Sequence, residues 1–242
     1  MIRDRKPLPD SITLALAERQ VSVRLRRNAR AKKYILRLPL ESDSPVLTVP
    51  KGGTLATAQK FVQKQSGWIE ERLASRTPRA DLVPGSHVPF RGQRHFIESA
   101  GRLRGLVEVR HDGPDPVLVV PGEPQAVPRK LLKFFKDEAR KDLECAVARH
   151  AGRVDRKVAA ISIRDTRSRW GSCASNGRLS FSWRLVLAPP EILDYVAAHE
   201  VAHLVHMDHS ERFWQVCFDL APHTRQAQKW LKAHGAQLHA VG

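Results

Sequence analysis

The sequence predicts an α+β protein in two parts, and three observations support this fold class. Residues 21–124 alternate apolar and polar side chains between glycines and prolines, which is typical of short antiparallel strands. Residues 125–242 instead repeat apolar side chains at intervals of three and four, which is typical of amphipathic helices. The chain has 242 residues, 42 % of them hydrophobic, so a sizeable core can form.

The N-terminal half is expected to be a mostly antiparallel β unit with one helix. Residues 1–20 form a loosely ordered lead-in, and residues 21–40 and 44–53 then alternate as strands do. A helix follows from Thr54, a suitable N-cap, to about residue 75, because apolar side chains recur there at helical spacing. More strands, separated by Gly and Pro, reach residue 124. No internal repeat is evident.

The C-terminal half, residues 125–242, is expected to begin with one long amphipathic helix from Pro128. A short strand follows at 159–166, then the loop SRWGSCASNG and a second strand from Arg178. Pro189 and Pro190 begin the next helix, since proline is tolerated in a first helical turn.

That next helix contains the motif His199-Glu200-Val201-Ala202-His203. Two histidines four residues apart lie on one face of a helix, about 6 Å apart along its axis. Both imidazoles can therefore reach one zinc ion. Glu200 lies beside them, where it can act as general base toward an attacking water.

A catalytic zinc site needs a third protein ligand, for which His206 and His209 are the candidates. On a continuous helix His206 would lie about 10 Å along the axis from His199, too far for the same site. His209 follows a break expected at Met207 and Asp208, so the chain can fold back there. We therefore favour His209, and His206 becomes a residue at the rim that can meet substrate. The spacing equals that of metzincins, but His206 replaces their glycine and no later methionine exists for a Met-turn.

A wider set of motifs resembles the YgjP-like metallopeptidases, relatives of the SprT-like and Wss-type zinc proteases. The similar residues are Arg169–Cys173, Asn176–Leu179, Trp183–Leu185, Pro189, Asp194–Val196, the HExxH motif, His209-Ser210 and Phe213-Trp214. The resemblance is close over about residues 126–235 and looser in residues 24–40 and around Gly67-Trp68-Ile69. It implies a zincin-like catalytic domain that holds one zinc ion with His199, His203 and His209, and it implies Glu200 as the catalytic residue. Asp208 departs from the family, which usually has Asn there.

Substrate contacts are expected around the loop that precedes Arg178. Gly177–Ser182 is a candidate edge strand along which an extended peptide could add as a further strand. Arg169 can stabilise an oxyanion or serve as a structural donor, and Trp170 can meet substrate or anchor the loop by packing. Tyr195 lies one turn before His199 and can touch substrate or support the ligand. Candidate substrate-binding residues are thus Arg169, Trp170, Arg178, Tyr195 and His206.

The net charge is +16, which attracts polyanions or simply marks a basic enzyme. One basic block around residues 24–37 contains no acidic residue, and it can either track a phosphate backbone or form a solvated strand face. A weak association with nucleic acid through Arg24, Arg26, Arg27 and Arg30 is therefore one expectation.

The expected cellular compartment of the protein follows from features that are missing from the sequence. The three cysteines form no CxxC pair, so neither a disulfide framework nor a thiolate zinc site is indicated. No apolar run is long enough to span a membrane, and the charged N-terminus does not read as a secretory signal. We expect a cytoplasmic protein without membrane contact.

The function expected from these features is zinc-dependent hydrolysis of peptide bonds, with polypeptide as the substrate. Two alternatives remain at this point. The same centre could hydrolyse non-peptide amides or esters. The zinc could also be structural, in a protein that associates with nucleic acid.

Overall fold

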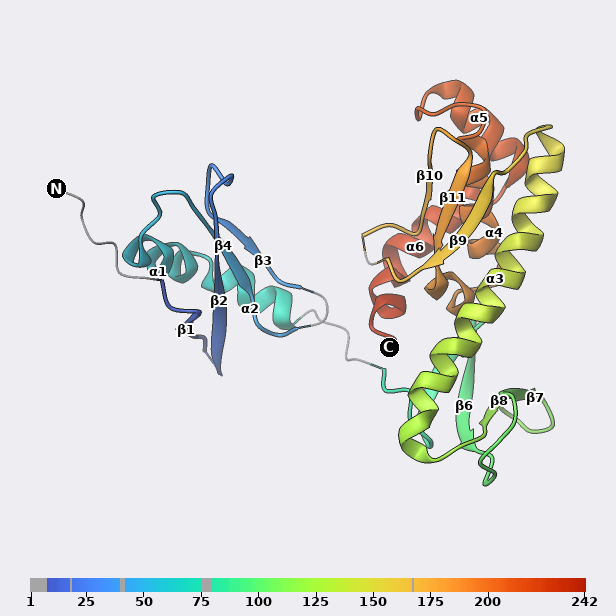
Figure 1. Ribbon diagram of the computed structural model, residues 1–242, viewed down its shortest axis with the longest axis horizontal. Coiled ribbons are helices and arrows are strands. Elements are labelled where there is room, and N and C mark those ends of the chain that lie inside the picture. Colours follow the sequence, from blue (N-terminus) through green and yellow to red (C-terminus); the bar gives the residue numbers. More distant parts are fainter. Residues whose placement is uncertain (1–7, 18, 40–41, 75–79, 167) are drawn as a thin grey trace. The chain divides into compact units, whose positions relative to one another are not determined.

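The computed structural model describes residues 8–17, 19–39, 42–74, 80–166 and 168–242. Contacts divide the chain into two compact units, Met1–Thr77 and Pro78–Gly242, and each unit has its own hydrophobic core. The described residues form three β-sheets and six α-helices, which confirms the α+β class (Figure 1).

Unit 1 is a four-stranded sheet with helices on one face. Its strands are β1 (Ser11–Ala15), β2 (Gln20–Asn28), β3 (Ile35–Arg37) and β4 (Val46–Pro50), in the order β1-β2-β4-β3. Alternate residues such as Val23, Leu47 and Val49 are fully buried against α1 (Leu55–Lys64) and α2 (Ser66–Ala74). Thr54 caps α1 as expected, because its hydroxyl accepts from the Thr57 amide at 3.2 Å.

Unit 1 differs from the sequence-based expectation in two respects. The expected lead-in, 1–20, contains β1, whose side chains Ile12 and Leu14 are buried in the sheet core. The expected single helix is two helices, since α1 ends at Lys64 and α2 begins at Ser66. Residues 1–7 of the lead-in lie outside the described part of the chain.

The first sheet of unit 2 consists of β5 (His87–Phe90), β6 (Gln93–Ser99), β7 (Glu108–Arg110) and β8 (Val117–Val120). It packs on the long helix α3 (Val127–Arg153), where the Phe90 ring lies 5.3 Å from that of Phe134 and 5.9 Å from that of Phe135. These strands share one core with the C-terminal helices. The unit boundary therefore lies at 77/78, whereas the sequence analysis expected a domain boundary at 124/125.

The two four-stranded sheets share one topology, which the sequence analysis did not detect. Both have the order first-second-fourth-third, with an antiparallel, a parallel and an antiparallel pairing. The fourth strands read PVLTVP at 45–50 and PVLVVP at 116–121. Each sheet is followed by a helix, α1 or α3. The chain thus contains a ββββα motif twice, and divergence elsewhere in the sequence conceals it.

The second sheet of unit 2 consists of β9 (Ala160–Arg164), β10 (Gly171–Cys173) and β11 (Arg178–Ser182), in the order β10-β11-β9. β11 pairs with β10 on one side and with β9 on the other. The expectation that Gly177–Ser182 forms an edge strand is therefore wrong. The edge strand beside the helix with the HExxH motif is β10.

Helices complete unit 2 around this sheet. After the short 3-10 helices η1 (Pro124–Ala126) and η2 (Trp183–Leu187) come α4 (Pro190–Ala202), α5 (Glu211–Leu220) and α6 (Thr224–His239). α4 begins at Pro190, as the sequence predicts, and residues such as Ala197, Ala198 and Val201 are fully buried. Among the described residues, no helix is both long and apolar enough to cross a membrane.

Candidate metal centre

Three histidines meet at the C-terminal end of α4. His199 lies in the last turn of this helix, His203 is the residue that caps its C-terminus, and His209 comes from the loop before α5. One ring nitrogen from each of the three lies within 4.8 Å of the others, and Nε2 of His199 is 3.3 Å from Nε2 of His209. His206 is not part of this group.

The separation of the His199 and His209 ring nitrogens equals that of two ligands on one zinc ion. Tetrahedral zinc with Zn–N bonds of about 2.0–2.1 Å separates its nitrogen ligands by about 3.3–3.4 Å. Burial, helped by the neighbouring His203 and His209, lowers the pKa of His199 to about 4. The imidazole is therefore neutral near pH 7, with a lone pair available for a metal. Three nitrogen ligands and one open position are typical of catalytic zinc.

The backbone of His206 orients one ligand. Nδ1 of His203 lies 3.1 Å from the carbonyl oxygen of His206, so it donates there and leaves Nε2 free to face the metal. This contact forms because α4 ends at Ala202 and the chain turns immediately, with the His206 amide bonded to the Ala202 carbonyl. The helix thus ends before the break expected at Met207 and Asp208.

Phe213 forms an aromatic support for all three histidines, a role that the sequence did not predict. Its ring stacks on His203 at 4.4 Å and meets the edges of His199 at 5.0 Å and His209 at 4.8 Å. It is fully buried on α5. Its position in the sequence is the one signal for this role, because Phe213 lies four residues after His209 at the start of the next helix.

Glu200 is a buried acid with a perturbed pKa. Its side chain is 5 % exposed, and burial raises its pKa to about 7 despite the opposing charge of Arg169. The carboxyl packs directly against Gly171 of β10, where an alanine Cβ would lie 2.5 Å from Oε1. An acid that titrates near neutral pH is suited to accept and return a proton.

The remaining candidate residues have diverse positions. Arg169 is close enough to Glu200 to lower its pKa. Trp170 stacks on His239 at 4.3 Å and packs beside Gly235, as an anchor between β10 and α6 would. Tyr195 is 6 % exposed and meets the edge of His199 at 5.9 Å.

Burial raises the pKa of Tyr195 to about 12, and its hydroxyl bonds to Gln228 of α6. Arg178 is exposed at the start of β11, opposite Ala160 of β9 and one position beyond the end of β10. Cys173 lies near Glu200, but burial raises the pKa of its thiol, so it remains protonated at neutral pH.

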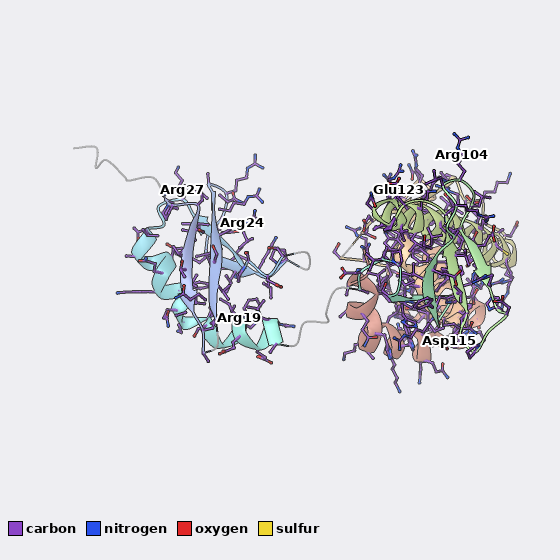
Figure 2. All side chains as sticks on the ribbon, turned by 90° about the horizontal axis from the view of Figure 1, so that it is seen from below. Arg19, Arg24, Arg27, Arg104, Asp115 and Glu123 are labelled. Atoms are coloured by element: carbon purple, nitrogen blue, oxygen red, sulfur yellow. The ribbon has the colours of Figure 1, made fainter. Side chains whose placement is uncertain are left out.

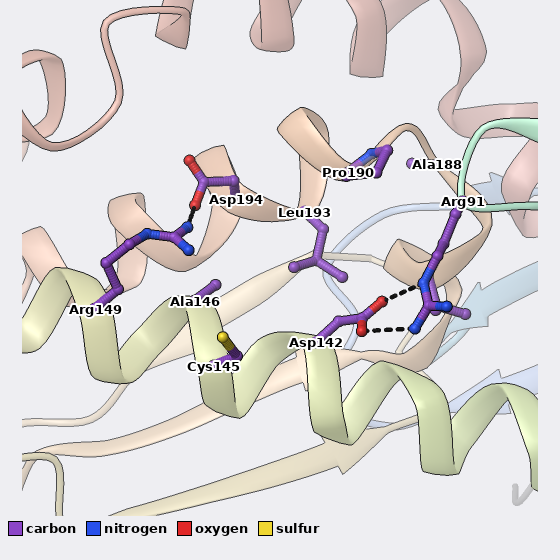
Figure 3. A pocket seen from close by; sticks show the side chains of 10 residues that line it. Arg91, Asp142, Cys145, Ala146, Arg149, Ala188, Pro190, Leu193 and Asp194 are labelled. Carbon is purple, nitrogen blue, oxygen red and sulfur yellow. Dashed lines mark hydrogen bonds and ion pairs between the residues drawn. The ribbon is translucent and has the colours of Figure 1, made fainter.

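A separate pocket of about 250 Å³ lies between α3 and the N-terminal half of α4 (Figure 3). Its two carboxylates are already paired, Asp142 with Arg91 and Asp194 with Arg149. The pocket does not include the three histidines or Glu200. The chemistry described above therefore belongs to a different place, where the C-terminal end of α4 packs against β10.

Comparison with known proteins gives three findings. A family model described as the YgjP-like metallopeptidase domain matches residues 32–234. Among solved structures, the chain is similar to the metallopeptidase zymogen of Pyrococcus abyssi abylysin, with 16 % identity and a TM-score of 0.35. That similarity covers 38 % of this chain and 93 % of the abylysin chain. No curated protein matches this sequence.

Proposed function

Because the chain belongs to the YgjP-like metallopeptidase family, we propose that it is a zinc-dependent peptidase acting on extended polypeptide segments. The observation that carries this proposal is the group of three imidazoles with the buried Glu200 on the adjacent residue of the same helix. His199, His203 and His209 would hold one zinc ion.

The reaction follows from the positions of these side chains. A bound zinc ion supplies Lewis-acid polarisation of the scissile carbonyl and makes water more acidic. Glu200 takes a proton from the attacking water and later returns it to the leaving amine. Burial keeps its pKa near 7, so both transfers are feasible at neutral pH. Arg169 keeps the Glu200 pKa from rising further and can stabilise negative charge beside it.

Substrate docking is proposed along β10. Alternate residues of this segment direct their backbone groups toward β11. Ser172 pairs with Ser180, the Ser182 amide donates to the Trp170 carbonyl, and the Ala174 amide donates to the Arg178 carbonyl. Strand alternation then directs the backbone groups of Gly171 and Cys173 toward the open edge. An extended peptide can pair with them whatever its side chains are.

Two changes test the docking proposal. Cys173→Pro removes a backbone N–H on the open edge and should reduce peptide turnover with zinc content unchanged. Two peptides can be compared, each N-methylated at alternate backbone positions, with the methyl groups shifted by one residue between them. Turnover should be lost for only one of the two. Equal turnover of both methylated peptides by the wild-type enzyme would contradict pairing along β10.

The proposed activity is tested by metal analysis together with hydrolysis of an unfolded protein such as reduced, alkylated casein. About one zinc per chain is expected, and His199→Ala or His203→Ala should remove it. Glu200→Gln should retain zinc and lose nearly all hydrolysis, because an amide cannot accept the proton. Wild-type rates in the zinc-loaded Glu200→Gln variant would contradict the proposed role of this residue.

The two alternatives make different predictions in the same assays. A hydrolase of small amides or esters would turn over those compounds in preference to unfolded protein. A structural zinc would be insensitive to Glu200→Gln in every respect. Against a structural site stands the count of ligands, since the cluster in the described residues supplies three histidines, not four protein ligands.

A further inference from the structure

The positive charge of this chain is concentrated in unit 1. Residues 1–77 contain 16 Lys and Arg against 7 Asp and Glu, and residues 78–242 contain 25 against 18. A net charge of +9 thus belongs to the smaller unit, which carries none of the histidines or Glu200 of the metal centre. Charge of this density attracts polyanions.

Among the described residues of unit 1, the helices cover only one face of the sheet. Helices α1 and α2 pack on the face that contains Val23, Leu47 and Val49. The opposite face, termed the open face, is defined by Ser22, Arg24, Arg26, Arg37, Val46 and Thr48. Strand register places these side chains together, because Arg24 pairs with Val46, Val46 with Arg37, and Arg26 with Thr48. All three arginines are exposed. Figure 2 labels Arg24 on this sheet.

The duplicated sheet in unit 2 provides an internal comparison. Because Val46 in β4 corresponds to Val117 in β8, register equates Arg24 with Phe96, Arg26 with Glu98 and Arg37 with Arg110. In unit 2 the acidic and basic positions form an ion pair, with Arg110 Nη2 2.8 Å from Glu98 Oε2.

In unit 1 both positions are basic, so the same diagonal brings two like charges together. Across the described part of the chain, the ion pairs include none formed by Arg24, Arg26 or Arg37. Like charges on one sheet face repel each other, and a bound anion compensates them.

From this contrast we propose that the open face binds the phosphate backbone of nucleic acid without sequence preference. Arg24 and Arg26 are two residues apart on β2, which separates their Cα atoms by about 6.7 Å. Arg37 lies two strands away, at about 10 Å across the sheet. The hydroxyls of Ser22 and Thr48 add donors suited to phosphate oxygens. This inference is independent of the proposed peptidase activity.

The test measures binding of the full chain to a fluorescein-labelled 20-nucleotide DNA strand, its duplex and the corresponding RNA. Anisotropy between 25 and 200 mM salt gives the dependence of affinity on salt. The double variant Arg24→Ala/Arg26→Ala should reduce the slope of log affinity against log salt concentration by about two. It should also weaken binding by about tenfold or more at low salt. Lys60→Ala/Lys64→Ala removes the same charge from α1, on the other side of unit 1, and should leave the slope nearly unchanged.

A second variant replaces the two arginines with the corresponding residues of unit 2 and does not shorten them to alanine. Arg24→Phe/Arg26→Glu copies the unit 2 residues, so the new acid can pair with Arg37 and the fold should be at least as stable. Its binding should be abolished, with zinc content and Tm retained. The proposal is overturned if the wild type binds no nucleic acid at 25 mM salt, or if both alanine variants lower the slope equally. Retention on anionic phosphatidylserine vesicles without nucleic-acid binding would also overturn it.

Discussion

Gly171→Ala is predicted to displace the proposed general base without removing the metal. In the structure an alanine Cβ would lie 2.5 Å from Oε1, 2.6 Å from Cγ and 2.8 Å from Cδ of Glu200. Non-bonded carbon contacts are optimal at about 3.5–4.0 Å, so β10 and the carboxylate must separate by about 1 Å. Glu200 is 5 % exposed, and the surrounding packing limits where it can move.

The expected effect on turnover follows from that displacement. A misplacement of about 1 Å in a catalytic constellation lowers rate by about 10²-fold, and overpacking destabilises a core by about 1–3 kcal/mol. The assay is kcat/KM on a fluorogenic unfolded protein, together with zinc content and Tm. Zinc should remain, because the three atoms nearest to the added methyl group all belong to Glu200 and none to a histidine.

A control and a double variant sharpen this test. Gly152→Ala, in α3 of the same unit, meets no atom within 4 Å and should leave activity unchanged. Glu200→Asp shortens the side chain and should itself reduce turnover, but it should relieve the contact with Ala at position 171. The losses in the double variant should therefore be less than additive. Wild-type turnover in the Gly171→Ala variant, or loss of its zinc, would refute the reasoning.

Three further predictions concern the metal centre. His209→Ala should abolish zinc binding, while His206→Ala should nearly preserve it in zinc titrations, because only the backbone carbonyl of His206 orients His203. Zinc at about 100 times Kd should stabilise the fold by about 2.7 kcal/mol and raise Tm by about 5–10 °C, as calorimetry can show. Burial raises the pKa of Glu200 from 4.5 to about 7, so the buried carboxyl favours folding of the metal-free protein in its protonated form. This contribution to the free energy of unfolding is fully present below pH 4.5 and is lost as the pH rises through 7. Glu200→Gln should therefore stabilise the metal-free protein at pH 8 by about 3 kcal/mol, with little gain at pH 5, by denaturant unfolding.

Local sequence signals predicted the local structure of the site. The HExxH spacing brings His199 and His203 together because helix geometry alone determines it. The preference for His209 over His206 rested on helix rise, and the structure places His209 within this cluster. The support from Phe213 and the contact of Gly171 with Glu200 depend on tertiary packing between α4, α5 and β10, which no spacing in the chain reveals.

Sheet order and domain limits were beyond the sequence for a related reason. The pattern of residues 178–182 identifies a strand but cannot say how many neighbours it has, and β11 has two. The change at Pro128 from strands to helix suggested a domain boundary, yet Phe90 packs on Phe134 and Phe135 across that boundary. The repeat is not evident in the sequence because residues that correspond in register, such as Arg26 and Glu98, differ in chemical character.

The twofold ββββα motif has a consequence for how the chain acquires its structure during synthesis. β4 and β8 are both central strands with nearly the same sequence, VLTVP and VLVVP, and each pairs in parallel with the second strand before it in the chain. Either strand can therefore compete for β2 while both are unpaired, which gives a misassembled, strand-exchanged state typical of repeat proteins. Emergence from the ribosome limits this competition, because β2 and β4 can pair before β8 exists. Refolding from denaturant, in which both strands are present at once, should consequently give a lower native yield than folding during translation.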